Sequence, residues 1–251
     1  MDILTRIDER IGYIQINREE RKNALTSAMY QTMADTLKAY DADDQVRVIL
    51  LHGLSDMFCA GNDLNDFLQN PLTGNDSPVV QFLFALRDLQ KPLVISVNGV
   101  AIGVGVTMLM HADFVVIGDD AKLQLPFINL ALCPEAGSSL LLAQRAGYLQ
   151  AAEKLMFGEF FTPQEALAMG VVTRIMPHHE VLRYAQHQAR HLAEKSPQAM
   201  RATKKLLKSA NADALRVAMD AELLSFAQLL KGADSREAMM AFFEKRKPNF
   251  M

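Results

Sequence analysis

The sequence is poor in the residues that build disulfide frameworks and metal centres. Its 251 residues include no tryptophan and only two cysteines, Cys59 and Cys133. Two cysteines exclude a disulfide framework and a four-cysteine zinc site. Among the six histidines only His187 and His191 have a metal-type spacing. No carboxylate partner is evident beside them, so a solvated helix face is the better interpretation. We therefore expect no metal site.

The chain also lacks an excess of charge and a long uninterrupted apolar run. It has 26 Lys and Arg against 29 Asp and Glu, a formal net charge of −3. This balance argues against a nucleic-acid partner, because such proteins bind phosphates with clustered cations. The longest apolar stretch, Val94–Met110, is interrupted too often for a membrane span. The first residues show no secretory signal. We expect a reduced, cytoplasmic location and no membrane partner.

Apolar residues are abundant, and they form strand-like and helix-like segments that alternate along the chain. Half of the residues are apolar and 22% are charged, which suits one large domain, or one domain with a smaller appendage. Strand-like and helix-like segments alternate, and this order predicts an α/β domain with crossover connections. The predicted strands are Ile3–Ile7, Gly12–Ile16, Val46–His52, Leu93–Val97 and Phe114–Ile117. The predicted helices are Thr26–Tyr40, with Thr26 as N-cap, Val79–Gln90, and one from Gly103–Gly105 to His111.

The remaining segments divide the chain into two parts. Residues 70–78 are rich in Pro, Gly and Asn and are predicted to form a loop. After about Pro163 the pattern is nearly all helical, with helix starts at Thr162–Glu165 and at Ser196–Pro197. We therefore expect a mixed α/β core over residues 1–190 and a helical region over residues 191–251.

Two glycine-containing loops follow predicted strands and are candidates for ligand binding. The first is Phe58–Leu64 and the second is Gly99–Gly105. Taken alone, each is better explained as a tight turn, with Asp63 as an N-cap, or as a close-packed helix start. A dinucleotide fingerprint is weak because position 108 is Met108. If both strands share a sheet, however, one amide from each loop can converge and form an oxyanion hole.

A third candidate is the segment Leu132–Ser139, which contains Pro134 and Glu135. Both residues suit the first turn of a helix, where the carboxylate would interact with the helix dipole. The alternative is a general base, if apolar walls such as Phe127, Leu130 and Leu132 raise the pKa of Glu135. Cys59 is interpreted as a small packing residue, and the basic tail Phe243–Lys247 as a solvated helix end or a phosphate site.

Several of these segments, in order, resemble the crotonase (enoyl-CoA hydratase/isomerase) superfamily over nearly the whole chain. The matching segments are Arg21–Leu25, Phe58–Leu64, Lys91–Gly103 and Phe242–Pro248. The resemblance implies a ββα-spiral core that binds acyl-CoA, a helical C-terminal trimerisation region, and a homotrimer or a dimer of trimers. It places the oxyanion-hole amides at Ala60 and Val104. It also implies contacts of the acyl-CoA substrate with Lys22, Ala24, Ala60, Gly61, Asn62, Asp63, Leu64, Phe242 and Lys245.

The resemblance is closest to the Δ3,Δ2-enoyl-CoA isomerases. Hydratases of the superfamily use two glutamates, and here their positions are occupied by Thr107 and Phe127, which do not carry protons in that way. The isomerase pattern instead implies Glu135 as the single proton shuttle, with no cofactor besides the coenzyme A thioester of the substrate. The alternatives are another reaction of the superfamily, including hydration, and a catalytically inactive acyl-CoA-binding scaffold.

Overall fold

The strands of the chain form two sheets. Within residues 1–69 and 74–250, which the computed structural model describes, one sheet has six strands and the other four. The larger sheet has the order β1 (Ile3–Asp8), β2 (Ile11–Ile16), β3 (Val48–His52), β5 (Leu93–Val97), β7 (Phe114–Gly118) and β10 (Arg174–Met176). The smaller sheet has the order β4 (Met57–Cys59), β6 (Val100–Ile102), β8 (Lys122–Gln124) and β9 (Phe160–Phe161).

From β3 to β8, consecutive strands alternate between the two sheets, and this generates a spiral. β3, β5 and β7 pair in parallel in the larger sheet, and β4, β6 and β8, which follow them directly, pair in parallel in the smaller one. Helices connect successive turns: α2 (Leu64–Gln69) and α3 (Pro78–Asp88), then α4 (Val104–Thr107) with the 3-10 turn Met108–His111. Each turn is thus strand, strand, helix. This arrangement confirms the predicted mixed α/β architecture with crossovers.

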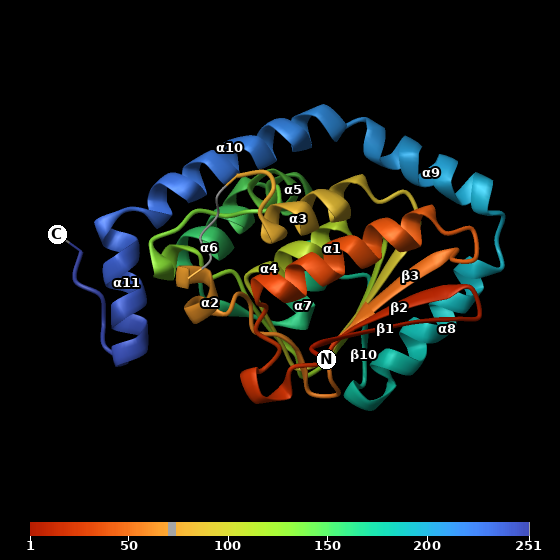
Figure 1. Cartoon of the computed structure of the whole chain (residues 1–251), viewed down its shortest axis with the longest axis horizontal. Coiled ribbons are helices and arrows are strands. Elements are labelled where there is room, and N and C mark those ends of the chain that lie inside the picture. The colour runs from red at the N-terminus through yellow and green to blue at the C-terminus, as the bar shows by residue number, and fades with distance from the viewer. Residues whose placement is uncertain (70–73, 251) are drawn as a thin grey trace.

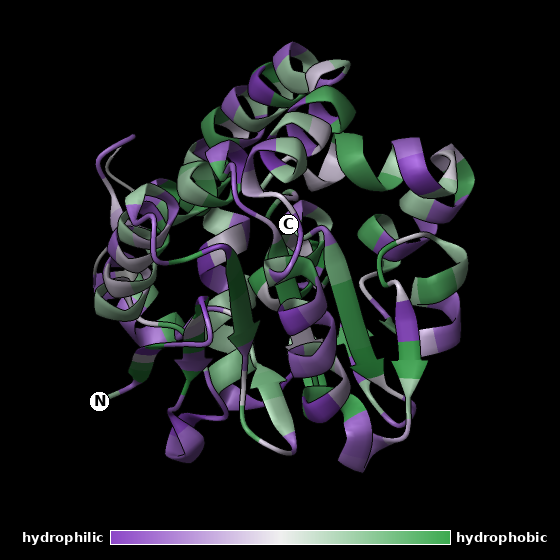
Figure 2. Cartoon of the chain, turned by 90° about the vertical axis from the view of Figure 1, so that its right-hand side faces the viewer, coloured by the Kyte–Doolittle hydropathy of each residue, from purple (hydrophilic) through white to green (hydrophobic). Residues whose placement is uncertain are grey.

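Helices cover both faces of the larger sheet (Figure 1). α1 (Ser27–Ala42) and α3 lie on one face, and α8 (Val181–Ala193) lies on the other. Along β3, Ile49 and Leu51 point to the α1 side while Val48 and Leu50 point to α8. A strand buried on both faces reads as a continuous apolar run, as the sequence of β3 does. The central strands are correspondingly the most apolar part of the ribbon in Figure 2.

The later part of the chain is mainly helical. α5 (Ser138–Ala146), α6 (Tyr148–Phe157) and α7 (Pro163–Ala168) are followed, beyond α8, by α9 (Pro197–Ser209), α10 (Ala212–Leu230) and α11 (Ala233–Glu244). In Figure 1 α9 and α10 run along the outside of the molecule and α11 turns back at its end. α10 packs on α5, and α11 packs on the 3-10 turn Ile128–Leu130. In the described part of the chain no helix combines the length and the apolar character needed to cross a bilayer.

Most predicted elements are confirmed, including the Thr26 cap, whose hydroxyl accepts the Met29 amide. Two predictions were wrong. Met57–Cys59 and Val100–Ile102, interpreted as loops, are strands of the smaller sheet, and β10 lies in a segment expected to be helical. Each is only three residues long, too short for an alternating pattern to appear. Of the predicted loop 70–78, residues 70–73 lie outside the described residues. The division near residue 190 stays a prediction.

Candidate functional site

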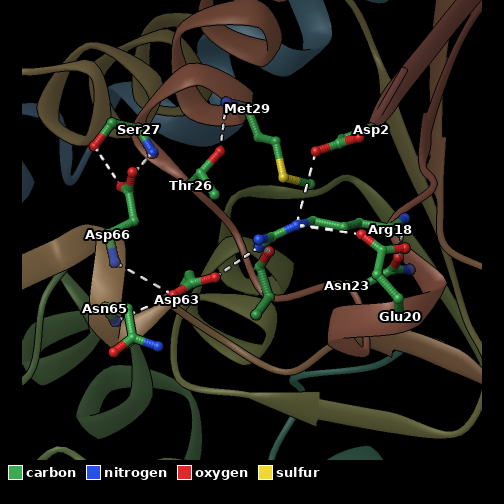
Figure 3. A network of polar contacts seen from close by, with 11 residues as sticks. Asp2, Arg18, Glu20, Asn23, Thr26, Ser27, Met29, Asp63, Asn65 and Asp66 are labelled. Carbon is green, nitrogen blue, oxygen red and sulfur yellow. Dashed lines mark hydrogen bonds and ion pairs between the residues drawn. The ribbon is translucent and has the colours of Figure 1, made fainter.

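A polar network fixes the first candidate loop (Figure 3). The side chain of Asn23, fully buried, donates to the carbonyls of Ile16, Met57 and Phe58 and accepts the amide of Arg18. Asn23 has a φ of +56°, a conformation that asparagine tolerates better than most residues. One side chain therefore joins the end of β2 to β4, directly before the loop begins.

Arg18 holds the other end of the same loop. Its guanidinium donates to the Asp63 carboxylate and to the Ala24 carbonyl, each at 2.8 Å. This arginine lowers the pKa of Asp63 against the opposing effect of burial. The Asp63 carboxylate also accepts the amide of Asp66, in the first turn of α2, whose own carboxylate accepts from Ser27. Asp63 thus caps α2, as one of the two interpretations of this loop predicted.

We expect Asn23→Ala to destabilise the protein strongly. The substitution removes the side-chain donor to the carbonyls of Ile16 and Phe58 and the acceptor of the Arg18 amide, whereas the Met57 carbonyl keeps its bond from the Leu54 amide. Each buried group left without a partner costs about 1–3 kcal/mol. Urea unfolding would measure the loss, with Asn211→Ala as a control because the exposed Asn211 side chain makes no capping bond at the start of α10. Equal free energies of unfolding for the two variants would contradict this role of Asn23.

In the first loop, the main-chain amide that is free to bind a ligand is not the one predicted from the sequence. Leu25 pairs with the loop as an isolated parallel bridge, donating to Gly61 and accepting from Asp63. The Ala60 amide, predicted for the oxyanion hole, donates to the Lys22 carbonyl at 3.2 Å. Within the described residues the Asn62 amide donates to no protein group. The amide left available for a ligand is therefore that of Asn62, two residues beyond the predicted one.

The second loop lies directly against the first. β4 and β6 are neighbours, and a Cβ on Gly61 would come within 3.2 Å of the Ile102 carbonyl oxygen. The chain turns at Gly103, whose φ is +55°, and α4 begins at Val104. The first amides of a helix have no intrahelical acceptor, so the Val104 N–H is available. Gly105 allows close contact of α4 with Cys59, whose carbonyl oxygen lies 2.9 Å from the position of an added Cβ.

Glu135 is buried beside this second loop. It is 6% exposed and accepts a hydrogen bond of 2.7 Å from the Thr107 hydroxyl on α4. Burial raises the pKa of Glu135 to about 7, although the bond from Thr107 opposes this shift. The segment around it is irregular, and α5 begins only at Ser138. The prediction that Pro134 and Glu135 form the first helical turn was wrong, because Gly137, with φ +72°, delays the helix start.

Three ionisable groups near Glu135, those of Cys59, His111 and Tyr30, are held neutral. Burial raises the pKa of Cys59 to about 12, which disfavours the thiolate and agrees with its interpretation as a packing residue. Burial lowers the pKa of His111 to about 3, and its ring nitrogen Nε2 lies 2.7 Å from the Ala136 carbonyl oxygen. The Tyr30 hydroxyl donates to the Asn62 side chain, and burial and the Glu135 charge raise its pKa.

A cavity of about 510 Å³ opens beside the two loops. Seven of the residues predicted to contact substrate line it: Ala24, Ala60, Gly61, Asn62, Asp63, Leu64 and Phe242. Val104 also lines the cavity, whereas the exposed Lys22 and Lys245 do not. Glu135 is not a lining residue either. Its partner Thr107 lies on the short helix that begins at Val104, and this helix connects the carboxyl group to the cavity.

Sequence reasoning found one part of the apolar wall, formed by Phe127, Leu130, Leu132 and Phe242, and missed another part, which includes Phe67 and Phe226. Five of the 13 phenylalanines line the cavity: Phe67, Phe127, Phe226, Phe242 and Phe243. Phe226 comes from α10 and its ring meets Phe67 of α2 edge-on, with 6.1 Å between centroids. No motif marks Phe226. Its only signal is its place on the apolar stripe of α10. Arg21, also missed, is the only Lys or Arg among the described lining residues.

Comparison with known sequences finds similar proteins over nearly the whole length of this chain. The sequence model of a family described as enoyl-CoA hydratase/isomerase matches residues 6–251. The 2,3-dehydroadipyl-CoA hydratase of Escherichia coli (strain K12) is 31% identical over 250 residues, covering 99% of this chain and 98% of that protein. Enoyl-CoA delta isomerase 2 of Rattus norvegicus is 32% identical, covering 97% of this chain and 64% of that protein.

Solved structures match over the full length. The enoyl-CoA hydratase/isomerase of Pseudoalteromonas atlantica T6c superposes with a TM-score of 0.95 at 36% identity, and the match covers 100% of both chains. Together with the alternating two-sheet topology, this likeness confirms the predicted crotonase-like ββα-spiral core with a helical C-terminal region. The relatives include both hydratases and isomerases, so the reaction is argued from the site itself.

Proposed function

Because this chain belongs to the enoyl-CoA hydratase/isomerase family, the crotonase superfamily, we propose that it moves the double bond of a 3-enoyl-CoA to position 2. The observation that carries this proposal is a single carboxyl group, that of Glu135, buried beside two adjacent loops with a pKa of about 7. The reaction removes a proton from carbon 2 and returns one to carbon 4. One carboxylate of near-neutral pKa can perform both steps.

The residues around Glu135 favour isomerisation over hydration. Hydration needs a second group to activate water, and the two positions where hydratases carry glutamates hold Thr107 and Phe127. The Thr107 hydroxyl donates its hydrogen bond to Glu135, and Phe127 is 7% exposed in an apolar wall. Neither side chain is a base for water. The mechanism therefore assigns all proton transfers to Glu135.

We assign the stabilisation of the enolate to the main chain. Removal of the carbon 2 proton places negative charge on the thioester oxygen, and two converging N–H donors in a poorly solvated site stabilise it. The proposed donors are the amides of Asn62 and Val104, which both belong to lining residues. Asn62 replaces Ala60 in this role because the Ala60 amide already binds the Lys22 carbonyl.

The lining also supports an uncharged acyl group as substrate. Arg21 is the single cation and Asp63 the single carboxylate among the described lining residues, and Asp63 is already paired with Arg18. The five phenylalanines bury apolar chain favourably and offer a terminal carboxylate no donor, so among the described lining residues the exposed Arg21 is the one cation that could pair with it. We propose 3-enoyl-CoA esters with hydrocarbon tails as substrates, in contrast to a dicarboxylic acyl group such as the one named for the E. coli relative.

We expect the rate to depend on pH through Glu135. The base must be ionised, and its pKa is raised to about 7, so kcat/KM should fall below pH 7 and level off above it. Initial rates between pH 5 and pH 9, followed at the absorbance of the conjugated thioester, would measure this. A limb centred near pH 4.5, the ordinary value for glutamate, would contradict a buried base.

The direct test incubates the purified protein with a trans-3-enoyl-CoA and, separately, with a 2-enoyl-CoA. The proposal predicts rapid conversion of the first and little hydration of the second. Rapid hydration would favour the alternative reaction, and binding of CoA esters without turnover would indicate a scaffold. The proposal keeps three features as predictions: a homotrimer or dimer of trimers, a cytoplasmic location and independence of any cofactor.

A further inference from the structure

The inner face of α10 carries a carboxylate where its pattern calls for an apolar residue. Met219 and Phe226 on this face are buried, and Glu222 lies between them, only 7% exposed. These positions are spaced by three and four residues, the spacing of one helical stripe. A buried carboxylate costs free energy unless hydrogen-bond donors surround it, so its retention in an apolar stripe requires an explanation.

The donors come from the start of α5, next to Glu135. Glu222 accepts the Gly137 amide at 2.5 Å, the Ser139 amide at 2.9 Å, and the Ser139 hydroxyl. No side chain within α5 caps its own N-terminus. Glu222 therefore caps α5 from a helix more than 80 residues further along the chain.

We propose that Glu222 is a positioning residue that holds the Glu135 segment in its working geometry. Glu135 lies two residues before Gly137, and its carbonyl accepts both the amide of Ser138 at 3.0 Å and the hydroxyl of Ser138 at 2.6 Å. Fixing the amides at 137 and 139 therefore fixes the main chain that carries Glu135. This inference rests on the proposed role of Glu135 as the proton carrier.

The charge of Glu222 also acts on Glu135, because it raises the pKa of the Glu135 carboxyl group. After burial, the nearby Glu222 charge is the second cause that raises the pKa of Glu135. The other groups that interact with Glu135 are Tyr30, Cys59 and Cys133, whose pKa values are raised mainly by burial, so they stay neutral. His111, which contacts the Ala136 carbonyl oxygen, is neutral. Burial lowers its pKa, and the nearby cations lower it further: Lys208, Arg145 and Lys204.

The same helix also forms part of the cavity wall. Phe226 follows Glu222 by one turn of α10 and lines the cavity, where its ring contacts Phe67. On the other side of Glu222, Leu215 and Met219 pack over Gly137. α10 is therefore a rigid connection between the wall that would contact the acyl chain and the segment that carries Glu135.

The test compares Glu222→Gln and Glu222→Asp with Asp220→Asn, which removes one negative charge from the exposed face of the same helix. Glutamine keeps one acceptor but loses the charge, and we expect kcat to fall roughly tenfold or more because the segment shifts, with little change in KM. The acidic limb of the pH profile should move to lower pH. Aspartate keeps the charge, so we expect it to restore part of kcat and the original limb. Asp220→Asn should resemble the unaltered protein.

A purely structural role predicts something different: lower stability, but unchanged kcat per folded molecule and an unchanged limb in Glu222→Gln. That result would overturn the inference. A carbon-13 NMR titration of the Glu135 carboxyl, assigned with Glu135→Gln, separates this inference from the proposed function. A lower Glu135 pKa in Glu222→Gln than in Asp220→Asn shows that Glu222 acts on Glu135 even if the protein does not isomerise 3-enoyl-CoA esters, and an unchanged pKa overturns the inference.

Discussion

Replacement of Glu135 by glutamine is expected to lower the rate of 3-enoyl-CoA isomerisation by roughly 10²–10⁴-fold, the range that a positioned acid-base group supplies. Glutamine keeps the size of the side chain and an oxygen that accepts the Thr107 hydroxyl. It does not take up a proton from carbon 2. Binding of the CoA ester should therefore persist while turnover is lost, and steady-state kinetics with isothermal titration would measure both.

The control for this variant is Glu194→Gln. The Glu194 side chain is 74% exposed at the end of α8 and makes only a distant contact with His191, so its loss should not alter the rate. Isomerisation by Glu135→Gln at the rate of the unaltered protein would show that another group carries the proton.

The second large effect is expected at Val104, where the proposed functional group is the main-chain N–H, a hydrogen-bond donor to the enolate oxygen. Proline removes this donor, and the first position of a helix is the place where proline fits best. We expect Val104→Pro to lower kcat by roughly 10²–10³-fold, the effect of losing one oxyanion-hole donor. Val104→Ala keeps the amide and should retain nearly full activity, which distinguishes loss of the donor from loss of the side chain.

The comparison requires that the proline variant folds, which circular dichroism and thermal unfolding would verify. Equal kcat and equal KM values for folded Val104→Pro and Val104→Ala would remove Val104 from the proposed oxyanion hole. An unchanged kcat with a large rise in KM would mean that the amide binds substrate and enolate equally well.

The sequence predicts the long elements of this fold and the identity of the candidate base. β3 and β5 are recognisable because burial on both faces demands continuous apolar runs, and α1 is recognisable from its Thr26 cap. The smaller sheet escapes prediction because three-residue strands have no period, and their pairing depends on neighbours far along the chain.

The sequence identifies most residues of the candidate site but not the contacts that they make. Glu135 is found through its motif, but its pKa depends on burial that only the packed structure supplies. Whether Ala60 or Asn62 offers a free amide depends on the pairing of Leu25 and Lys22 with the loop, a tertiary contact. Glu222 interrupts the apolar stripe of α10, but the sequence does not show what it contacts, because its partners at Gly137 and Ser139 are distant along the chain.

The cavity wall has a consequence for the order in which the site is made. The two loops lie near residues 62 and 104, whereas Phe226, Phe242 and Phe243 lie on α10 and α11. During synthesis the ribosome releases the loops well before these aromatic side chains. A nascent chain that has folded its spiral therefore lacks most of this aromatic lining, and the lining is complete only after the last two helices have docked.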